Sequence, residues 1–191
     1  MLNIYILAYT LLVAFFVIEH FFRRGKDTKN MNRSEHDKSS TTYISIVMGL
    51  AFIILPISPL LNWLGIGAIQ IFSIGVFGLF LGITGLIIRY IAFSTLGRFF
   101  TRTLRESDDH VLITNGIYKY IRHPGYLSDF LIFIGTALAM SNLIPIVVIP
   151  VTFTLAYAYR IKIEERMLLK IFREQYSDYQ KTSKRLIPFI L

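Results

Sequence analysis

The feature that most restricts the fold is the absence of charge from two long stretches of the sequence. No Asp, Glu, Lys or Arg occurs from Ser39 to Ile88 or from Phe130 to Tyr159. Because about 20 apolar residues already cross a bilayer, these stretches exclude a soluble globular fold and a disordered chain. The chain has no cysteine, which excludes a disulfide scaffold and thiolate chemistry. The sequence therefore predicts an all-α integral membrane protein.

Breaks within the apolar stretches predict five membrane-spanning helices. The first apolar run has positive charge after it and none before it, so it is interpreted as a retained helix and not as a signal peptide. Pro56, Pro59 and the segment 62–67 interrupt the second run, and Ser141-Asn142 with Pro145 predicts a hairpin in the third. The predicted spans are 2–22, 43–61, 66–88 and two short helices within 126–159.

The positions of the basic residues predict the orientation of these spans. The chain carries 20 Lys and Arg against 12 Asp and Glu, a formal charge of +8. All the basic residues lie in 23–38, 94–122 and 160–185 or at Arg89, which is expected to close the third span. Cytoplasmic loops collect Lys and Arg, so the N-terminus is expected outside and the C-terminus in the cytoplasm. This segregation explains the charge without nucleic-acid binding, for which no recognition motif is present.

The sequence divides into an N-terminal three-span region, 1–93, with a cytoplasmic loop at 23–42, and a C-terminal half, 94–191. Apolar residues recur at helical spacing from Ile161 to Tyr179 among basic ones, which predicts an amphipathic helix along the lipid headgroups. Small residues at helical spacing permit close helix packing, either inside the bundle or in a homo-oligomer. Such a face is formed by Gly75, Gly78, Gly82 and Gly85.

Between the third and fourth predicted spans, the segment 110–126 is more polar than a simple connection requires. Residues 111–113 favour an extended backbone and Asn115-Gly116 a turn, so this piece is either a surface turn or an edge that pairs with a planar heterocycle such as adenine. His123-Pro124 predicts a helix start, because proline suits the first helical position. The free N–H groups of that first turn attract anions, although an ordinary interfacial start has the same pattern.

Arg160 and Glu164 are four residues apart at the cytoplasmic end of the fifth predicted span. They share one helical face, where they form either an ordinary ion pair or a binding pair. In the second case the guanidinium holds a carboxylate through two parallel hydrogen bonds, and Glu164 holds a cation or hydroxyl groups. These two alternatives remain open from the residues alone.

The C-terminal half resembles the isoprenylcysteine carboxyl methyltransferase family. The matching pieces are Leu96–Phe100, His110–Tyr118, Arg122–Tyr126, Asn142, Glu164–Glu165, Phe172–Tyr179 and Arg185–Phe189, in the family's order. The resemblance implies an integral membrane enzyme that binds S-adenosyl-L-methionine in a cytoplasmic-side pocket and releases S-adenosyl-L-homocysteine. Related phospholipid methyltransferases and, more weakly, membrane sterol reductases share single pieces.

The resemblance also implies roles for individual residues. It assigns Arg160 to the substrate side as the catalytic residue and implies no metal. It assigns cofactor binding to His110, Val111, Leu112, Ile113, Tyr118, His123, Pro124, Gly125, Tyr126 and Glu164. The chain departs from the family at Arg173, where glycine is frequent, and the variable spacing before His110 leaves a contact near Thr103 to Arg105 unplaced.

The expected function is methyl transfer to a lipophilic acceptor within the bilayer, most simply the carboxylate of a prenylated cysteine. Three alternatives stay open. The first is a phospholipid or other small-lipid methyltransferase. The second is a reductase that uses NADPH through the basic loop 98–105, and the third is a non-catalytic membrane subunit. Binding of S-adenosylhomocysteine or of NADPH distinguishes them.

Overall fold

The computed structural model describes residues 2–22, 39–69, 71–97 and 112–186. Its helices are α1 (Leu2–Phe22), α2 (Ser40–Trp63), α3 (Phe72–Leu96), the 3-10 helix η4 (Gly116–Lys119), α4 (Pro124–Ala139) and α5 (Leu143–Thr182). In this described part of the chain no strand is formed, and β-type pairing is limited to two isolated bridges. The prediction of an all-α protein is confirmed.

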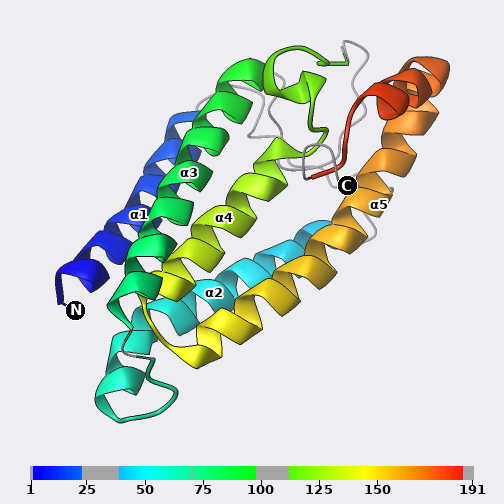
Figure 1. Ribbon diagram of the computed structural model, residues 1–191. Helices are drawn as coiled ribbons and strands as arrows, with labels where there is room; N and C mark the ends of the chain where they lie inside the picture. The colour runs from blue at the N-terminus through cyan, green and yellow to red at the C-terminus, as the bar shows by residue number, and fades with distance from the viewer. Residues whose placement is uncertain (1, 23–38, 70, 98–111, 187–191) are drawn as a thin grey trace.

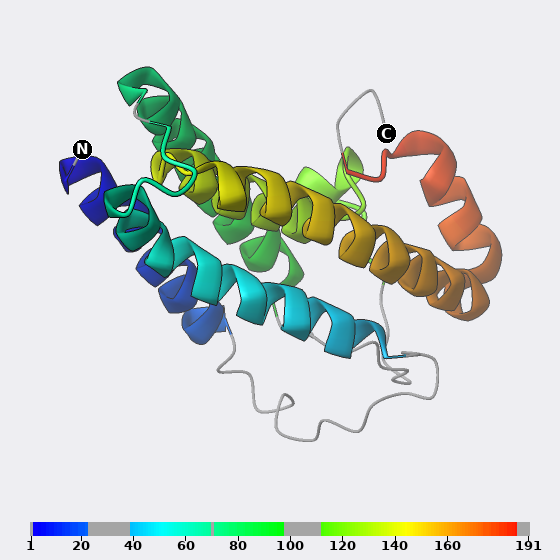
Figure 2. The same cartoon turned by 90° about the horizontal axis from the view of Figure 1, so that it is seen from below.

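The helices pack into one bundle whose core is shared by both halves of the chain. α3 lies against α1 and α4, and α2 lies against α5 (Figure 1). The view from below shows α2 and α5 running together across the other helices (Figure 2). The largest fully buried core side chains come from both halves: Leu55, Ile132, Phe133, Met140, Ile149 and Phe153. The regions 1–93 and 94–191 therefore form one packing unit.

Four helices, α1, α2, α3 and α5, are long and apolar enough to cross a membrane. α4 is also apolar but has 16 residues, or about 24 Å at ~1.5 Å per residue. α5 has 40 residues but is interrupted by a kink at Arg173, and its part before the kink, 143–172, is about 45 Å long at ~1.5 Å per residue, longer than the roughly 30 Å of a bilayer core. Its charged residues begin at Arg160, so we treat 143–159 as its membrane-spanning part.

The end of α2 was predicted to within two residues, and the start of α3 was predicted wrongly. α2 contains Pro56 and Pro59 inside the helix, so the interruption of the apolar run lies after Trp63 and not at the prolines; the carbonyl of Pro56 accepts a hydrogen bond from the Tyr9 hydroxyl at 2.8 Å. α3 begins at Phe72 and not at 66, and it continues to Leu96. Arg89 therefore lies inside α3 and is buried, so it does not close the third span.

The predicted hairpin between α4 and α5 is confirmed at Ser141 and Asn142. Ser141 has a positive φ of 50°, and Asn142 caps α5 by accepting a hydrogen bond from the backbone N–H of Ile144 at 2.9 Å. The Asn142 amide also donates to the side chain of Asn62 and to the carbonyl of Ile66, both at 2.8 Å. These bonds join the hairpin to the loop that follows α2.

The four glycines of α3 are buried within the bundle. A Cβ at Gly78 would lie 2.5 Å from the carbonyl oxygen of Gly135 in α4, and one at Gly82 would lie 2.5 Å from Leu11 Cδ1 in α1. Such distances require the absence of side chains, as small-residue packing between membrane helices does. The glycine face is therefore used inside this chain, and a homo-oligomer would have to form through another surface.

α5 changes direction at Arg173, which has the non-helical angles φ 46° and ψ −119°. Before this point, basic residues such as Lys162 and Arg166 are exposed, whereas Ile161 and Met167 are buried. After it, the chain turns back toward η4 and the start of α4 (Figures 1 and 2). The residue that departs from the resembled family thus occupies a position with the backbone angles that glycine adopts most readily.

We expect Arg173→Gly to stabilise the protein by about 1 kcal/mol, because glycine adopts a positive φ without the steric cost that a side chain brings. The melting temperature in detergent should rise by roughly 2–4 °C, as measured by intrinsic fluorescence. Lys170→Gly, an exposed position in the regular part of α5, is the matched control and should lower it. An equal decrease in both variants would contradict the assignment of strain to Arg173.

Candidate active site

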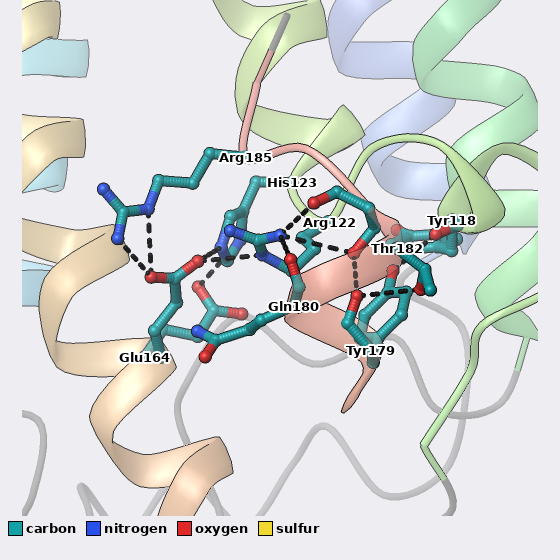
Figure 3. Close-up of polar contacts among 10 residues, drawn as sticks. Tyr118, Arg122, His123, Glu164, Tyr179, Gln180, Thr182 and Arg185 are labelled. Carbon is teal, nitrogen blue, oxygen red and sulfur yellow. Dashed lines mark hydrogen bonds and ion pairs between the residues drawn. The ribbon is translucent and has the colours of Figure 1, made fainter. Parts of the chain in front are cut away.

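The predicted site residues that are described gather where the chain from Leu112 to Tyr126 meets the charged half of α5 and the C-terminal tail. Figure 3 shows the side chains of Arg122, His123 and Glu164 pointing toward one another in this region. His110, Val111 and the whole basic loop 98–105, with its segment Thr103 to Arg105, lie outside the described residues.

His123 and Pro124 begin α4 as predicted. Pro124 is the first helical residue and His123 is the residue that precedes the helix. The carbonyl of His123 accepts hydrogen bonds from the backbone N–H groups of Tyr126 at 3.1 Å and Leu127 at 3.2 Å. A Cβ at Gly125 would meet Phe93 at an ordinary 3.7 Å, so no close approach requires glycine there. This helix start fixes the ring of His123 at the edge of the bundle.

The hydroxyl of Tyr126 joins the two α5 residues that the sequence singled out. It donates to Oε2 of Glu164 at 2.5 Å and accepts from Nε of Arg160 at 3.2 Å. Nη1 of Arg160 donates to the hydroxyls of Ser40 at 2.7 Å and Thr41 at 3.1 Å, at the start of α2. Arg160 is 4% exposed. The pair therefore faces the protein interior, which supports the binding alternative over a solvated ion pair.

The imidazole of His123 lies between two carboxylates. Its Nδ1 is 3.9 Å from Oε2 of Glu164 and its Nε2 is 3.4 Å from Oε1 of Glu165. The ring stacks on Tyr126 with centroids 5.5 Å apart and an interplanar angle of 15°. Nε2 is buried and, among the described residues, makes no hydrogen bond of good geometry. His123, Tyr126 and Glu164 thus form one contiguous polar group.

Glu165 forms ion pairs with the segment before α4 and with the C-terminal tail. Its Oε1 accepts from Nε of Arg122 at 3.0 Å, and its Oε2 accepts from Nε and Nη2 of Arg185 at 3.0 and 2.9 Å. Burial raises the pKa of Glu165, but the nearby His123 and the two arginines outweigh burial and lower the pKa to about 2. Glu165 is therefore ionised at neutral pH and carries a structural role beside Glu164.

The C-terminal tail is hydrogen-bonded along the segment before α4. The backbone N–H of Arg122 donates to the carbonyl of Lys184 at 2.8 Å, and the N–H of Lys184 donates to the carbonyl of Tyr120 at 2.9 Å. The N–H of His123 donates to the carbonyl of Arg185 at 3.1 Å. This parallel pairing was not predicted, because residues sixty positions apart in sequence carry no shared pattern.

Tyr118 and the residues before it form the far side of the site. Tyr118 is buried and lies in η4, and its carbonyl accepts a hydrogen bond from the hydroxyl of Tyr179. Burial raises the pKa of Tyr118, and the charge of Glu164 raises it further, so the phenol stays neutral. Leu112 and Ile113 are half-buried, and Ile113 packs beside Tyr118.

A buried charge cluster that the sequence did not predict lies next to the site. The guanidinium of Arg89 donates hydrogen bonds to Glu19 in α1 and Asp129 in α4, and it lies 4.4 Å from the ring centroid of Phe15. The hydroxyl of Tyr157 donates to Asp129 at 2.6 Å. Four helices therefore meet at Arg89. Because Arg89 lies 70 residues from Glu19 and 40 residues from Asp129, the ion pairs form no local motif.

The cluster reaches the candidate site through aromatic contact. The ring of Tyr157 lies 4.8 Å from that of Tyr126, whose hydroxyl joins Arg160 and Glu164. Tyr126 is thus held by Tyr157 on one side and by His123 on the other.

Comparisons with known proteins agree with this arrangement. A sequence model of the Isoprenylcysteine carboxyl methyltransferase (ICMT) family matches residues 78–170. The match starts earlier than the resemblance described above and ends before the C-terminal tail. It includes Tyr126, Arg160 and Glu164 and leaves out α1 and α2.

Individual relatives extend the similarity. Protein-S-isoprenylcysteine O-methyltransferase of Dictyostelium discoideum is 34% identical over 143 residues, which are 74% of this chain and 60% of that protein. The Tribolium castaneum enzyme of the same name is 39% identical over 115 residues, with 41% of its length covered. The chain thus spans about 40–60% of the length of these relatives. Protein-S-isoprenylcysteine O-methyltransferase B of Arabidopsis thaliana is 32% identical over 81% of this chain and 82% of its own length.

A solved structure has a similar fold. The eukaryotic intramembrane Ras methyltransferase ICMT, determined without a monobody, gives a TM-score of 0.58 at 30% identity, over 96% of this chain and 62% of that one. Together, the matched segment, the nearly full-length Arabidopsis relative and this structural similarity show that the chain belongs to the isoprenylcysteine carboxyl methyltransferase family.

Proposed function

We propose that this chain is an integral membrane enzyme that transfers a methyl group from S-adenosylmethionine to the carboxylate of a lipophilic acceptor, in the first instance a prenylated cysteine. The observation that carries the proposal is the Tyr126 hydroxyl, which joins Arg160 and Glu164 in one buried group. The relatives supply the reaction class, since they are protein-S-isoprenylcysteine O-methyltransferases.

The residues present fit the cofactor. The Glu164 side chain keeps 24% of its surface exposed, and the neighbouring His123 side chain is 3% exposed. The carboxylate of Glu164 and the buried ring of His123 therefore border the same space. Glu164 can accept hydrogen bonds from ribose hydroxyls or balance a positive charge. Leu112, Ile113, Tyr118, Pro124 and Gly125 would complete the cofactor side of this space, and a cofactor role for His110 and Val111 rests on the family resemblance alone. When bound, the cofactor supplies an electrophilic methyl group on a sulfonium.

The chemistry requires little more than alignment from the protein. A carboxylate with a pKa near 4 is already ionised at neutral pH, so no general base is needed for methyl transfer to it. Arg160 orients the acceptor carboxylate with its planar guanidinium, and the apolar surroundings exclude water. Positioning of this kind is worth up to roughly 7–11 kcal/mol of the activation barrier.

We propose that the chain crosses the membrane five times. α4 would be the fifth, short crossing, and α5 beyond Tyr159 would lie along the cytoplasmic headgroups with Lys162 and Arg166 toward lipid phosphates. The N-terminus would then be outside, with the site and the C-terminus in the cytoplasm. A reporter fused after Leu191 should be cytoplasmic and one before Leu2 external, and reporters on the same side would overturn five crossings.

The reaction is tested with purified full-length protein in lipid vesicles. We expect calorimetry to detect S-adenosylhomocysteine binding and no NADPH binding. We also expect labelled methyl to pass from S-adenosylmethionine to amine-blocked farnesylcysteine as a base-labile ester. The methyl amide of the same compound, which lacks a free carboxylate, is the control. Transfer to phosphatidylethanolamine instead would identify a phospholipid methyltransferase, and NADPH binding alone would identify a reductase.

A further inference from the structure

The guanidinium of Arg160 is fixed by hydroxyls from outside its own helix. Nη1 donates to Ser40 at 2.7 Å and to Thr41 at 3.1 Å, while Nε donates to Tyr126 at 3.2 Å. Ser40 is fully buried and Arg160 is 4% exposed. Three hydroxyl oxygens from α2 and α4 therefore contact a guanidinium that belongs to α5.

Other hydroxyls of α2 are used differently. Ser45 donates to the carbonyl of Thr41 at 2.8 Å, and Ser58 donates to the carbonyl of Ile54 at 2.7 Å, the usual bond to the preceding helical turn. The hydroxyls of Ser40 and Thr41 instead accept from Arg160, more than a hundred residues later in the sequence. Ser39, which precedes the helix, makes no side-chain cap, so capping does not explain the run of hydroxyl residues.

We infer that Ser40 and Thr41 are positioning residues that set the plane of Arg160 for the acceptor, and that the start of α2 thereby takes part in acceptor recognition. This inference rests on the proposed function. Both residues lie outside the segment 78–170 that matches the family, so the acceptor side would be shaped by a part of the chain that the family pattern does not define.

The physical reason is the geometry of the guanidinium. A guanidinium is planar, so the orientation of its plane sets the direction of every N–H group that can meet an acceptor carboxylate, and the bonds from Nη1 and Nε to hydroxyls limit the rotation of that plane. The hydroxyls restrict this rotation without neutralising the charge, since they are uncharged. A carboxylate at the same place would pair with Arg160 permanently and would compete with the acceptor.

The test compares Thr41→Val, which removes the hydroxyl at nearly constant volume, with Thr41→Ser, which keeps it. We expect Thr41→Val to raise the KM for farnesylcysteine about tenfold, the size expected for one lost hydrogen bond to a charged group, with an unchanged Kd for S-adenosylhomocysteine. Thr41→Ser should retain the wild-type KM. Ser40→Ala should act like Thr41→Val, and Ser45→Ala in the same helix is the control that should change neither constant.

The possible results separate the two proposals. A wild-type protein that binds S-adenosylhomocysteine but methylates no farnesylcysteine would overturn the proposed function. An active wild type with the same KM in Thr41→Val and Thr41→Ser would overturn the positioning role alone. A parallel loss of cofactor affinity and melting temperature in Thr41→Val would show that the hydroxyl only maintains the fold. Should Ser40→Ala not fold, the Thr41 pair decides the question.

Discussion

Arg89→Met should be the most destabilising single substitution in the described part of the bundle. It leaves Glu19 and Asp129 buried without their cationic partner, at the point where α1, α3 and α4 meet. Removing one member of a buried ion pair typically costs about 3–5 kcal/mol, because the remaining charge stays out of water. The melting temperature in detergent should therefore fall by roughly 10 °C. Fluorescence-detected unfolding of the purified protein measures this shift.

A compensated variant provides the control. Arg89→Met combined with Glu19→Leu and Asp129→Asn leaves no charge in this cluster, and the asparagine still offers an oxygen to the Tyr157 hydroxyl. Replacing an entire buried ion pair by groups of similar volume is often nearly neutral, so much of the lost stability should return. If the triple variant were as unstable as Arg89→Met, hydrogen bonding and ring contacts of Arg89, not uncompensated charge, would account for the loss.

The sequence predicted those parts of the fold that depend on local pattern. Uncharged runs predicted where the apolar helices lie, Ser141-Asn142 predicted the hairpin, and His123-Pro124 predicted the start of α4; five spans were predicted, and the described part of the chain has four helices long enough to cross a membrane and the shorter α4. The bounds of α3 were wrong because proline and glycine signals do not reveal which hydrogen bonds tertiary packing supplies. The buried position of Arg89 was missed for the same reason, since a basic residue near the end of an apolar run resembles a topological signal.

In the candidate site, too, local pattern was predicted from the sequence and contacts between distant segments were not. The i,i+4 spacing correctly placed Arg160 and Glu164 on one helical face. Whether they form an ordinary ion pair or a binding pair depends on the position of Tyr126, and only the packing of α4 against α5 provides that position. The roles of Ser40 and of the tail at Lys184 depend on contacts between segments more than sixty residues apart. No periodicity records such contacts.

A comparison of Glu164→Gln with Arg160→Lys tests whether Glu164 binds the cofactor while Arg160 orients the acceptor. Glu164→Gln removes the negative charge next to His123 and should raise the Kd for S-adenosylhomocysteine at least tenfold. Arg160→Lys keeps the charge but loses the planar guanidinium and the Nε bond to Tyr126, so it should leave this Kd nearly unchanged and lower turnover about 100-fold. Calorimetry and methyl transfer to farnesylcysteine at saturating cofactor give the two quantities.

Tyr126→Phe completes this experiment because it removes the one hydroxyl that contacts both side chains while keeping the ring that packs on Tyr157 and His123. Its effects should combine a moderate loss of cofactor affinity with a moderate loss of turnover. In the double variant with Arg160→Lys, the turnover losses should be less than additive, since the Nε bond to Tyr126 is already absent. An equal loss of cofactor affinity in Glu164→Gln and Arg160→Lys would instead mean that the two residues act as a structural ion pair. The acceptor carboxylate would then have to be oriented by another group.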